Sequence, residues 1–180
     1  MSDWSPELVG QIRERIRDVP DFPKPGIMFK DLTPVFAHGP TFRRLIDGLA
    51  ERYRGEQIDT IVGIEARGFI LAAPLATALG AGLVILRKPG KLPWKTYSQS
   101  YALEYGTDTL EVHQDAVRGG MRAVIMDDLL ATGGTMSAAV ELVTRLGGVV
   151  HEAGFVVELS FLKGRHRLPE GTKVGSVLVY

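Results

Sequence analysis

The sequence predicts an α/β fold in which a parallel central sheet is flanked by helices. From residue 58 onward, short apolar runs alternate with helical patterns, and the runs are almost continuously apolar. Strands that are apolar on both faces are typical of parallel sheets covered by helices on both sides. A glycine-rich turn at residues 131–135 follows one such run and precedes a helix, which is typical of α/β proteins that bind ligands at the strand ends.

Composition narrows the class of protein. The 180 residues, 45% of them hydrophobic, predict a single domain spanning 1–180 with its own core. Because 21 lysines and arginines balance 21 aspartates and glutamates, we expect neither nucleic acid nor a membrane as partner. The absence of cysteine excludes disulfides, thiol nucleophiles and thiolate metal sites, and it fits a cytoplasmic protein.

The N-terminal third is predicted to hold two helices around an irregular segment. Ser5 and Pro6 suit the first turn of a helix whose apolar repeat extends to Ile16. Residues 20–40 contain five prolines and two glycines, which favours an ordered but irregular segment. The second helix is predicted from apolar residues that share one helical face, namely Phe42, Leu45, Ile46, Leu49 and Tyr53.

Strands and helices then alternate toward the C-terminus. The predicted strands are 58–64, 83–86, 123–126, 154–159 and an edge strand at 177–180, and the predicted helices are 69–79 and 136–146. Residues 88–114 interrupt this pattern with two alternating stretches, 101–105 and 109–113, that predict a hairpin. So long an excursion after a core strand is typical of a lid.

The most informative stretch is VIMDDLLATGGT, residues 124–135. An apolar strand leads through Asp127 and Asp128 into a small-residue turn and a helix. Successive backbone N–H groups at a helix N-terminus bind a phosphate dianion, and ionised carboxylates accept hydrogen bonds from vicinal hydroxyls. A 5′-phosphorylated ribose fits both halves, although the aspartates could instead only cap a loop. The predicted phosphate-binding residues are Ala131, Thr132, Gly133, Gly134 and Thr135.

This string resembles the 5-phosphoribosyl-1-pyrophosphate (PRPP) signature of the type I phosphoribosyltransferases. In the same order as in the adenine-specific members, further segments resemble that family: DFPKPGIMFKDLTP, GIEARGF, RKPGKLP and YALEYGTDTLEVH. The resemblance covers roughly residues 20–163. It implies a Rossmann-like core with a small N-terminal hood, a mobile lid and a homodimer. It also implies a purine-salvage reaction that joins adenine to PRPP through N9 and releases AMP and pyrophosphate.

Four basic residues are candidates for binding pyrophosphate. Arg67, Arg87 and Lys88 follow predicted strands, whose C-terminal ends meet at one edge of a parallel sheet. Lys91 could join them when the lid closes, and the alternative for all four is a solvated surface charge. The resemblance implies that Arg67 is also catalytic, and that the peptide between Glu65 and Ala66 is cis. It implies Mg²⁺ as cofactor, held mainly by substrate phosphates and waters rather than by protein ligands.

The resemblance also implies residues that read the base and move the proton. Adenine would contact Ile27, Met28, Phe29 and Lys30, with the peptide groups of Met28 and Lys30 reading its edge. On sequence alone, the three apolar residues would be assigned to a core. Glu104 is implied as the general acid/base for the purine, although its spacing alone indicates an outward-facing strand residue.

The sequence leaves two alternative functions open and differs from the family pattern in two places. The enzyme could use another base, such as xanthine or hypoxanthine, or the chain could be a regulator that senses PRPP and binds nucleic acid. The second alternative is disfavoured because no DNA-binding domain precedes the helix at Glu7 and the net charge is zero. Lys30 stands where many family members have arginine, and the stretch after Gly164 has no predicted role.

Overall fold

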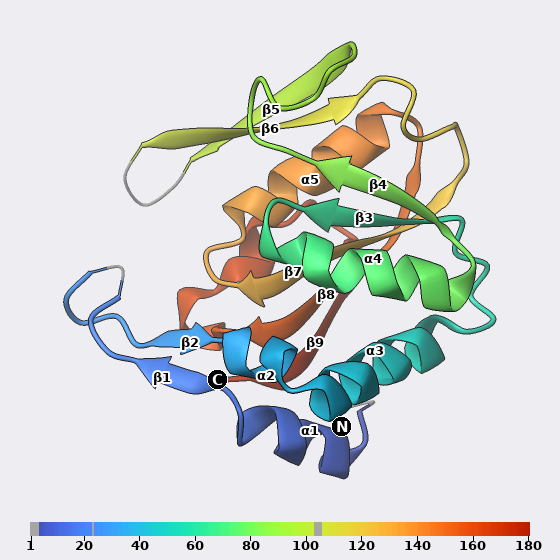
Figure 1. Cartoon of the computed structure of the whole chain (residues 1–180). Helices are drawn as coiled ribbons and strands as arrows, with labels where there is room; N and C mark the ends of the chain where they lie inside the picture. The colour runs from blue at the N-terminus through green and yellow to red at the C-terminus, as the bar shows by residue number, and fades with distance from the viewer. Residues whose placement is uncertain (1–3, 23, 103–105) are drawn as a thin grey trace. The chain divides into compact units, whose positions relative to one another are not determined.

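The computed structural model describes residues 4–22, 24–102 and 106–180 (Figure 1). The chain divides into two compact units. The first unit is Met1–Arg52 and the second is Tyr53–Tyr180. The single domain expected from the chain length stays a prediction. In the described ranges, no helix combines the length and the apolar character that a membrane span requires.

The first unit contains helices and one small strand pair. Its opening helix starts as predicted, because the Ser5 hydroxyl accepts a hydrogen bond from the N–H of Leu8 at 3.1 Å. It ends at Arg13, before Ile16, and the chain then enters a strand. The segment predicted to be irregular therefore contributes a strand and a short helix. The elements are α1 (Pro6–Arg13), β1 (Arg17–Val19), β2 (Phe29–Asp31), α2 (Thr33–Ala37) and α3 (Gly39–Tyr53), with β1 and β2 antiparallel.

The second unit is built around a five-stranded sheet in the order β4-β3-β7-β8-β9, and every pair in it is parallel (Figure 1). This confirms the predicted fold class and the predicted strands. Three predictions were too short. Strand β7 continues through Asp127 and Asp128 to Leu130, so both aspartates belong to the strand, and β8 and β9 begin earlier than predicted, at Val149 and Val174. The strands are β3 (Thr60–Ile64), β4 (Gly82–Leu86), β7 (Arg122–Leu130), β8 (Val149–Glu158) and β9 (Val174–Val179).

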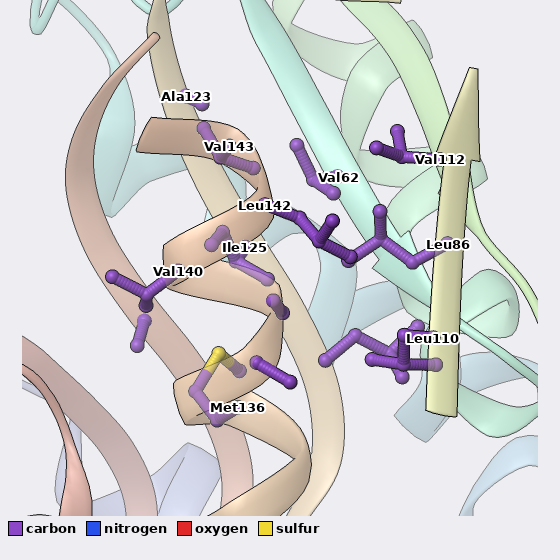
Figure 2. Close-up of a cluster of buried hydrophobic side chains, with 14 of the residues drawn as sticks. Val62, Leu86, Leu110, Val112, Ala123, Ile125, Met136, Val140, Leu142 and Val143 are labelled. Carbon is purple, nitrogen blue, oxygen red and sulfur yellow. The ribbon is translucent and has the colours of Figure 1, made fainter. Parts of the chain in front are cut away.

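Successive side chains of a strand point to opposite sides of the sheet, so these apolar strands present apolar side chains on both faces. A helix covers each face. On one face, α4 (Arg67–Leu79) packs so closely that a Cβ on Gly63 would lie 2.8 Å from the Cβ of Ala72. On the other face, Val62 enters a buried apolar cluster with α5 (Gly134–Arg145), as Figure 2 shows. Other members of this cluster are Leu86, Leu110, Val112, Ile125, Met136, Leu142 and Val143.

The predicted hairpin is present as β5 (Thr96–Ala102) and β6 (Thr107–His113), paired antiparallel. Its first strand begins earlier than the predicted stretch 101–105, of which residues 103–105 lie outside the described residues. It buries Leu110 and Val112 in the cluster of Figure 2. Arg87, directly after β4, exchanges two backbone hydrogen bonds with Glu111, at 2.9 and 2.8 Å. The hairpin is thus tied to the end of a core strand, while its movement as a lid stays a prediction.

Candidate active site

The glycine-rich turn lies between β7 and α5, at the C-terminal edge of the sheet. Gly133 has a φ of 83°, a left-handed conformation that glycine adopts without steric cost, and among the described residues no side chain caps the helix that follows. The first N–H groups of a helix have no partner within it, so this end offers donors to an anion. A cavity of about 70 Å³ opens here, lined by the turn together with Asp127, Met136 and Phe155.

The two aspartates at the end of β7 have different surroundings. Asp128 is buried, with 3% of its surface exposed, and its carboxylate pairs with the guanidinium Nε of Arg67. Asp127 lines the cavity and accepts a hydrogen bond from the backbone N–H of Asp128 at 2.9 Å. Burial and the neighbouring Asp128 carboxylate raise the pKa of Asp127. One carboxylate therefore positions Arg67, and the other faces the space beside the turn.

Glu65, which the sequence analysis did not identify as a site residue, gathers the cations that follow β3 and β4. Its carboxylate accepts the Arg87 Nε–H at 3.3 Å and the Lys88 backbone N–H at 2.8 Å, and it pairs with the Lys91 ammonium. Burial alone would raise the pKa of Glu65, but the hydrogen bonds from Lys91, Lys88 and Arg87 lower it to about 2. The sequence did contain a signal for Glu65, because it is an acidic residue placed between an apolar strand and Arg67.

The peptide bond that joins Glu65 to Ala66 is cis, as the resemblance implied. It directly precedes Arg67, the first residue of α4. Glu65 and Arg67, which carry opposite charges, both follow the end of β3 at Ile64.

The Lys88 ammonium points away from Glu65 and contacts the hairpin. It donates to the Tyr101 hydroxyl at 2.9 Å and pairs with the Asp108 carboxylate, to which the Tyr101 hydroxyl donates at 3.2 Å. The four predicted cations therefore have three different carboxylate partners, and Arg67 is held by Asp128. Arg87 and Lys91 are held by Glu65, whereas the ammonium of Lys88 is held by the hairpin.

The residues predicted to contact the base belong to the first unit. Ile27 and Met28 precede β2, and Phe29 and Lys30 begin it. Met28 is 44% exposed, whereas the Lys30 ammonium donates to Asp18 at 2.6 Å across the strand pair. Glu104 lies outside the described residues, so its assignment stays a prediction from the family resemblance.

The donor set limits how a metal could be held. Within residues 4–22, 24–102 and 106–180, no three histidine, aspartate or glutamate side chains are grouped so that they could hold a metal ion. Asp127 and Asp128 remain as hard oxygen donors at the site, which suit Mg²⁺ when most of its shell comes from phosphates and water.

Comparisons with known proteins agree on one family. The model of the phosphoribosyl transferase domain matches residues 36–170. An adenine phosphoribosyltransferase of Geobacter metallireducens is 58% identical over 94% of this chain and 99% of its own length. A crystal structure of the Thermoanaerobacter pseudethanolicus enzyme of that name superposes with a TM-score of 0.92 at 51% identity, covering 96% and 99% of the two chains. The Saccharomyces cerevisiae enzyme, complexed with adenine and an imino-altritol bisphosphate, gives 0.90 at 40% identity over 95% and 98%.

Proposed function

This chain belongs to the phosphoribosyltransferase family, among its adenine phosphoribosyltransferases, and from that premise we propose that it transfers the phosphoribosyl group of PRPP to N9 of adenine. The products are AMP and pyrophosphate. The chain is thus a pentosyltransferase, a glycosyltransferase of purine salvage.

The turn at residues 131–135 carries this proposal. It presents backbone N–H groups at the start of α5, where a 5′-phosphate dianion is stabilised by both hydrogen bonds and the helix dipole. Asp127 lines the same cavity and, once ionised, accepts hydrogen bonds from the vicinal hydroxyls of a ribose. Asp128 contributes through Arg67, whose guanidinium it orients. A phosphate cradle next to a hydroxyl acceptor matches the two ends of a phosphoribosyl group.

Transfer requires that negative charge on the departing pyrophosphate be neutralised while the anomeric carbon becomes cationic. Arg67 and Arg87 follow β3 and β4, whose C-terminal ends are neighbours in the sheet. Their paired carboxylates, Asp128 and Glu65, fix them before substrate arrives, so little reorganisation is needed during the reaction. Lys91 adds a third cation held by Glu65. Mg²⁺, which would be held mainly by substrate phosphates and waters with Asp127 as a nearby oxygen donor, would supply further charge neutralisation.

For the base, we propose that the peptide groups of Met28 and Lys30 read the adenine edge, with Ile27 and Phe29 packing near the ring. The pairing of Lys30 with Asp18 supports this, because it occupies the side chain and leaves selectivity to the backbone. Glu104 is proposed to exchange the imidazole proton as N9 attacks, in both directions of the reaction.

A homodimer is proposed as the working form. Large apolar side chains are exposed on the adjacent elements α4 and β4, at Ile70, Leu83 and Ile85, with 41%, 47% and 36% of their surfaces accessible. Apolar exposure of this kind at a sheet edge is typical of surfaces that a partner covers. Light scattering of the purified protein tests the dimer, and cell fractionation tests the predicted cytoplasmic location.

The deciding experiment is a product assay. Purified protein is incubated with PRPP and Mg²⁺ in the presence of adenine, hypoxanthine, xanthine or guanine, and nucleotides are separated by chromatography. We expect AMP with adenine and little product otherwise. IMP as the main product would assign a different base, and PRPP binding without any nucleotide formation would favour a sensor. The Gly133→Leu variant serves as the inactive control.

A further inference from the structure

Asp108 holds the ammonium of a lysine that the site needs. We propose that Asp108 is a positioning residue that competes with pyrophosphate for Lys88: in the ligand-free protein the carboxylate keeps the ammonium on the hairpin, and pyrophosphate takes it over. This inference rests on the function proposed above.

The hold on Lys88 comes from both strands of the hairpin. Tyr101 on β5 and Asp108 on β6 are directly opposite each other in the antiparallel register. The tyrosine hydroxyl accepts from the ammonium at 2.9 Å and donates to the carboxylate at 3.2 Å, and the carboxylate also pairs with the ammonium. The ammonium lies 5.5 Å from the centre of the Tyr101 ring, within the range of a cation–π contact. The Lys88 ammonium, the Tyr101 hydroxyl and the Asp108 carboxylate are therefore hydrogen-bond partners of one another.

The backbone of Lys88 lies with the cations that Glu65 holds. Its N–H donates to Glu65 at 2.8 Å, and the same carboxylate binds Arg87 and Lys91. The backbone is thus fixed among the predicted pyrophosphate ligands while the ammonium points to the hairpin. Because the side chain of lysine has a flexible four-carbon stem, rotamer changes can move the ammonium without moving the backbone.

The hairpin end of this contact adjoins the phosphate turn. A Cβ on Gly134 would lie 3.2 Å from a ring carbon of Tyr101 and 2.9 Å from the carbonyl oxygen of Ala102. Tyr101 therefore packs on the first residue of α5 and also binds Lys88. Tyr101 thus contacts both the N-terminus of α5, which is proposed to bind the 5′-phosphate, and Lys88, which is proposed to bind pyrophosphate.

The charges favour an exchange of partners. The side chains of Lys88 and Asp108 are 33% and 31% exposed, so water screens their attraction, and ion pairs of such exposure contribute little to stability. Pyrophosphate carries several negative charges, whereas Asp108 carries one. The polyanion is therefore the stronger partner, and the free energy of breaking the Lys88 pair is subtracted from its affinity.

Calorimetric binding of magnesium pyrophosphate to four proteins tests this: wild type, Asp108→Asn, Lys88→Met and the double variant. Asp108→Asn keeps the shape and the hydrogen bond that its side chain accepts from the Thr109 N–H. We expect it to tighten binding about two- to fivefold, because the ion pair no longer has to be broken. In the Lys88→Met background the same change should have no effect. Asp115→Asn, an exposed residue with the same charge change, is the matched control.

The sign and the coupling decide the outcome. Weaker or unchanged binding in Asp108→Asn would mean that Asp108 only supports the hairpin, and equal tightening in both backgrounds would mean a general field effect; either result overturns the proposal. Asp108→Thr, which suits a strand, repeats the test if the asparagine variant folds poorly. AMP formation by the wild type is measured in parallel, so a failure of the proposed function is recognised separately.

Discussion

Gly133 and Gly164 pack backbone against backbone behind the phosphate turn. A Cβ on Gly133 would collide with the carbonyl oxygen of Gly164, and a Cβ on Gly164 would collide with the carbonyl oxygen of Ala131. Gly164, which begins the stretch that had no predicted role, thus supports the turn from behind. Arg165 anchors this stretch through two hydrogen bonds to Glu158, at 2.7 and 2.6 Å.

Gly164→Ala should weaken AMP binding although the residue is not predicted to touch the ligand. The added methyl must displace the turn, and a shift of such size commonly lowers affinity or rate by roughly 10- to 100-fold. Calorimetry with AMP measures the effect, and circular dichroism checks that the fold persists. Gly119→Ala is the control, because a Cβ there meets nothing within 4 Å. Equal AMP affinity in the two variants would show that the turn does not depend on this support.

Asp127→Asn should change how stability depends on pH. Burial and Asp128 raise the pKa of Asp127 above its ordinary value of 3.8, so its contribution to stability is full below that pH and is lost as the pH rises through the folded-state pKa. Asparagine does not ionise, so the Tm of the variant relative to wild type should be higher at pH 8 than at pH 4. AMP affinity should fall about tenfold, because a carboxylate binds hydroxyls better than an amide does.

Thermal unfolding across this pH range, with Asp115→Asn as control, checks the prediction. A Tm difference that is flat with pH, or that falls as the pH rises, would contradict the conclusion that ionising the half-buried Asp127 beside Asp128 costs stability. Retained AMP affinity would remove Asp127 from the ribose contacts and leave the stability argument in place.

Lys30→Arg should leave the preference for adenine nearly unchanged. The side chain of Lys30 is 12% exposed and engaged with Asp18, and arginine can form the same pair. Selectivity then comes from the peptide groups of Met28 and Lys30, since hypoxanthine reverses the donor and acceptor at both atoms. Two unsatisfied buried groups imply a discrimination on the order of a hundredfold or more. Competition assays with adenine and hypoxanthine measure it, and a switch toward hypoxanthine would assign the reading to the side chain.

Glu104→Gln should slow the chemical step far more than it weakens adenine binding. Glutamine keeps the shape and hydrogen bonding of the side chain but removes its proton exchange, and general acid–base catalysis contributes about 10²- to 10⁴-fold. Glu104→Leu should weaken adenine binding as well. Single-turnover rates at saturating substrates across neutral pH provide the measurement. A glutamine variant within about threefold of the wild-type rate would leave proton transfer to water.

The sequence predicted the second unit well because its strands and helices are long and strongly patterned. The short strands at Arg17–Val19 and Phe29–Asp31 were missed, because three residues are too few to establish a period of two. The end of β7 was placed too early, since Asp127 and Asp128 interrupt its apolar run. The strand nevertheless continues because β7 stays paired with β8 as far as Leu130, and Arg67, far away in the sequence, pairs with the charge of Asp128.

Site residues were predicted individually, whereas their partners were not. Arg67 and Arg87 were identified as cations at the strand ends and Lys91 as a cation of the lid, but the carboxylates that orient them, Asp128 and Glu65, depend on tertiary contacts. The orientation of the Lys88 ammonium toward the hairpin was likewise hidden, because it is decided by the register of β5 and β6. A motif specifies residue types, and the fold selects their partners.

The division of the chain at Arg52 and Tyr53 also bears on how such an enzyme can diversify. The residues proposed to read the base lie before that boundary, whereas the turn at 131–135 and the cations at 67, 87 and 91 lie after it. The groups proposed to read the edge of the base and the groups proposed to bind the sugar phosphates are thus encoded in separate stretches, while Glu104, proposed to exchange the proton of the base, belongs to the second stretch. Changes confined to the first 52 codons could therefore give the enzyme a different nucleobase specificity while its sugar-phosphate chemistry stays unchanged.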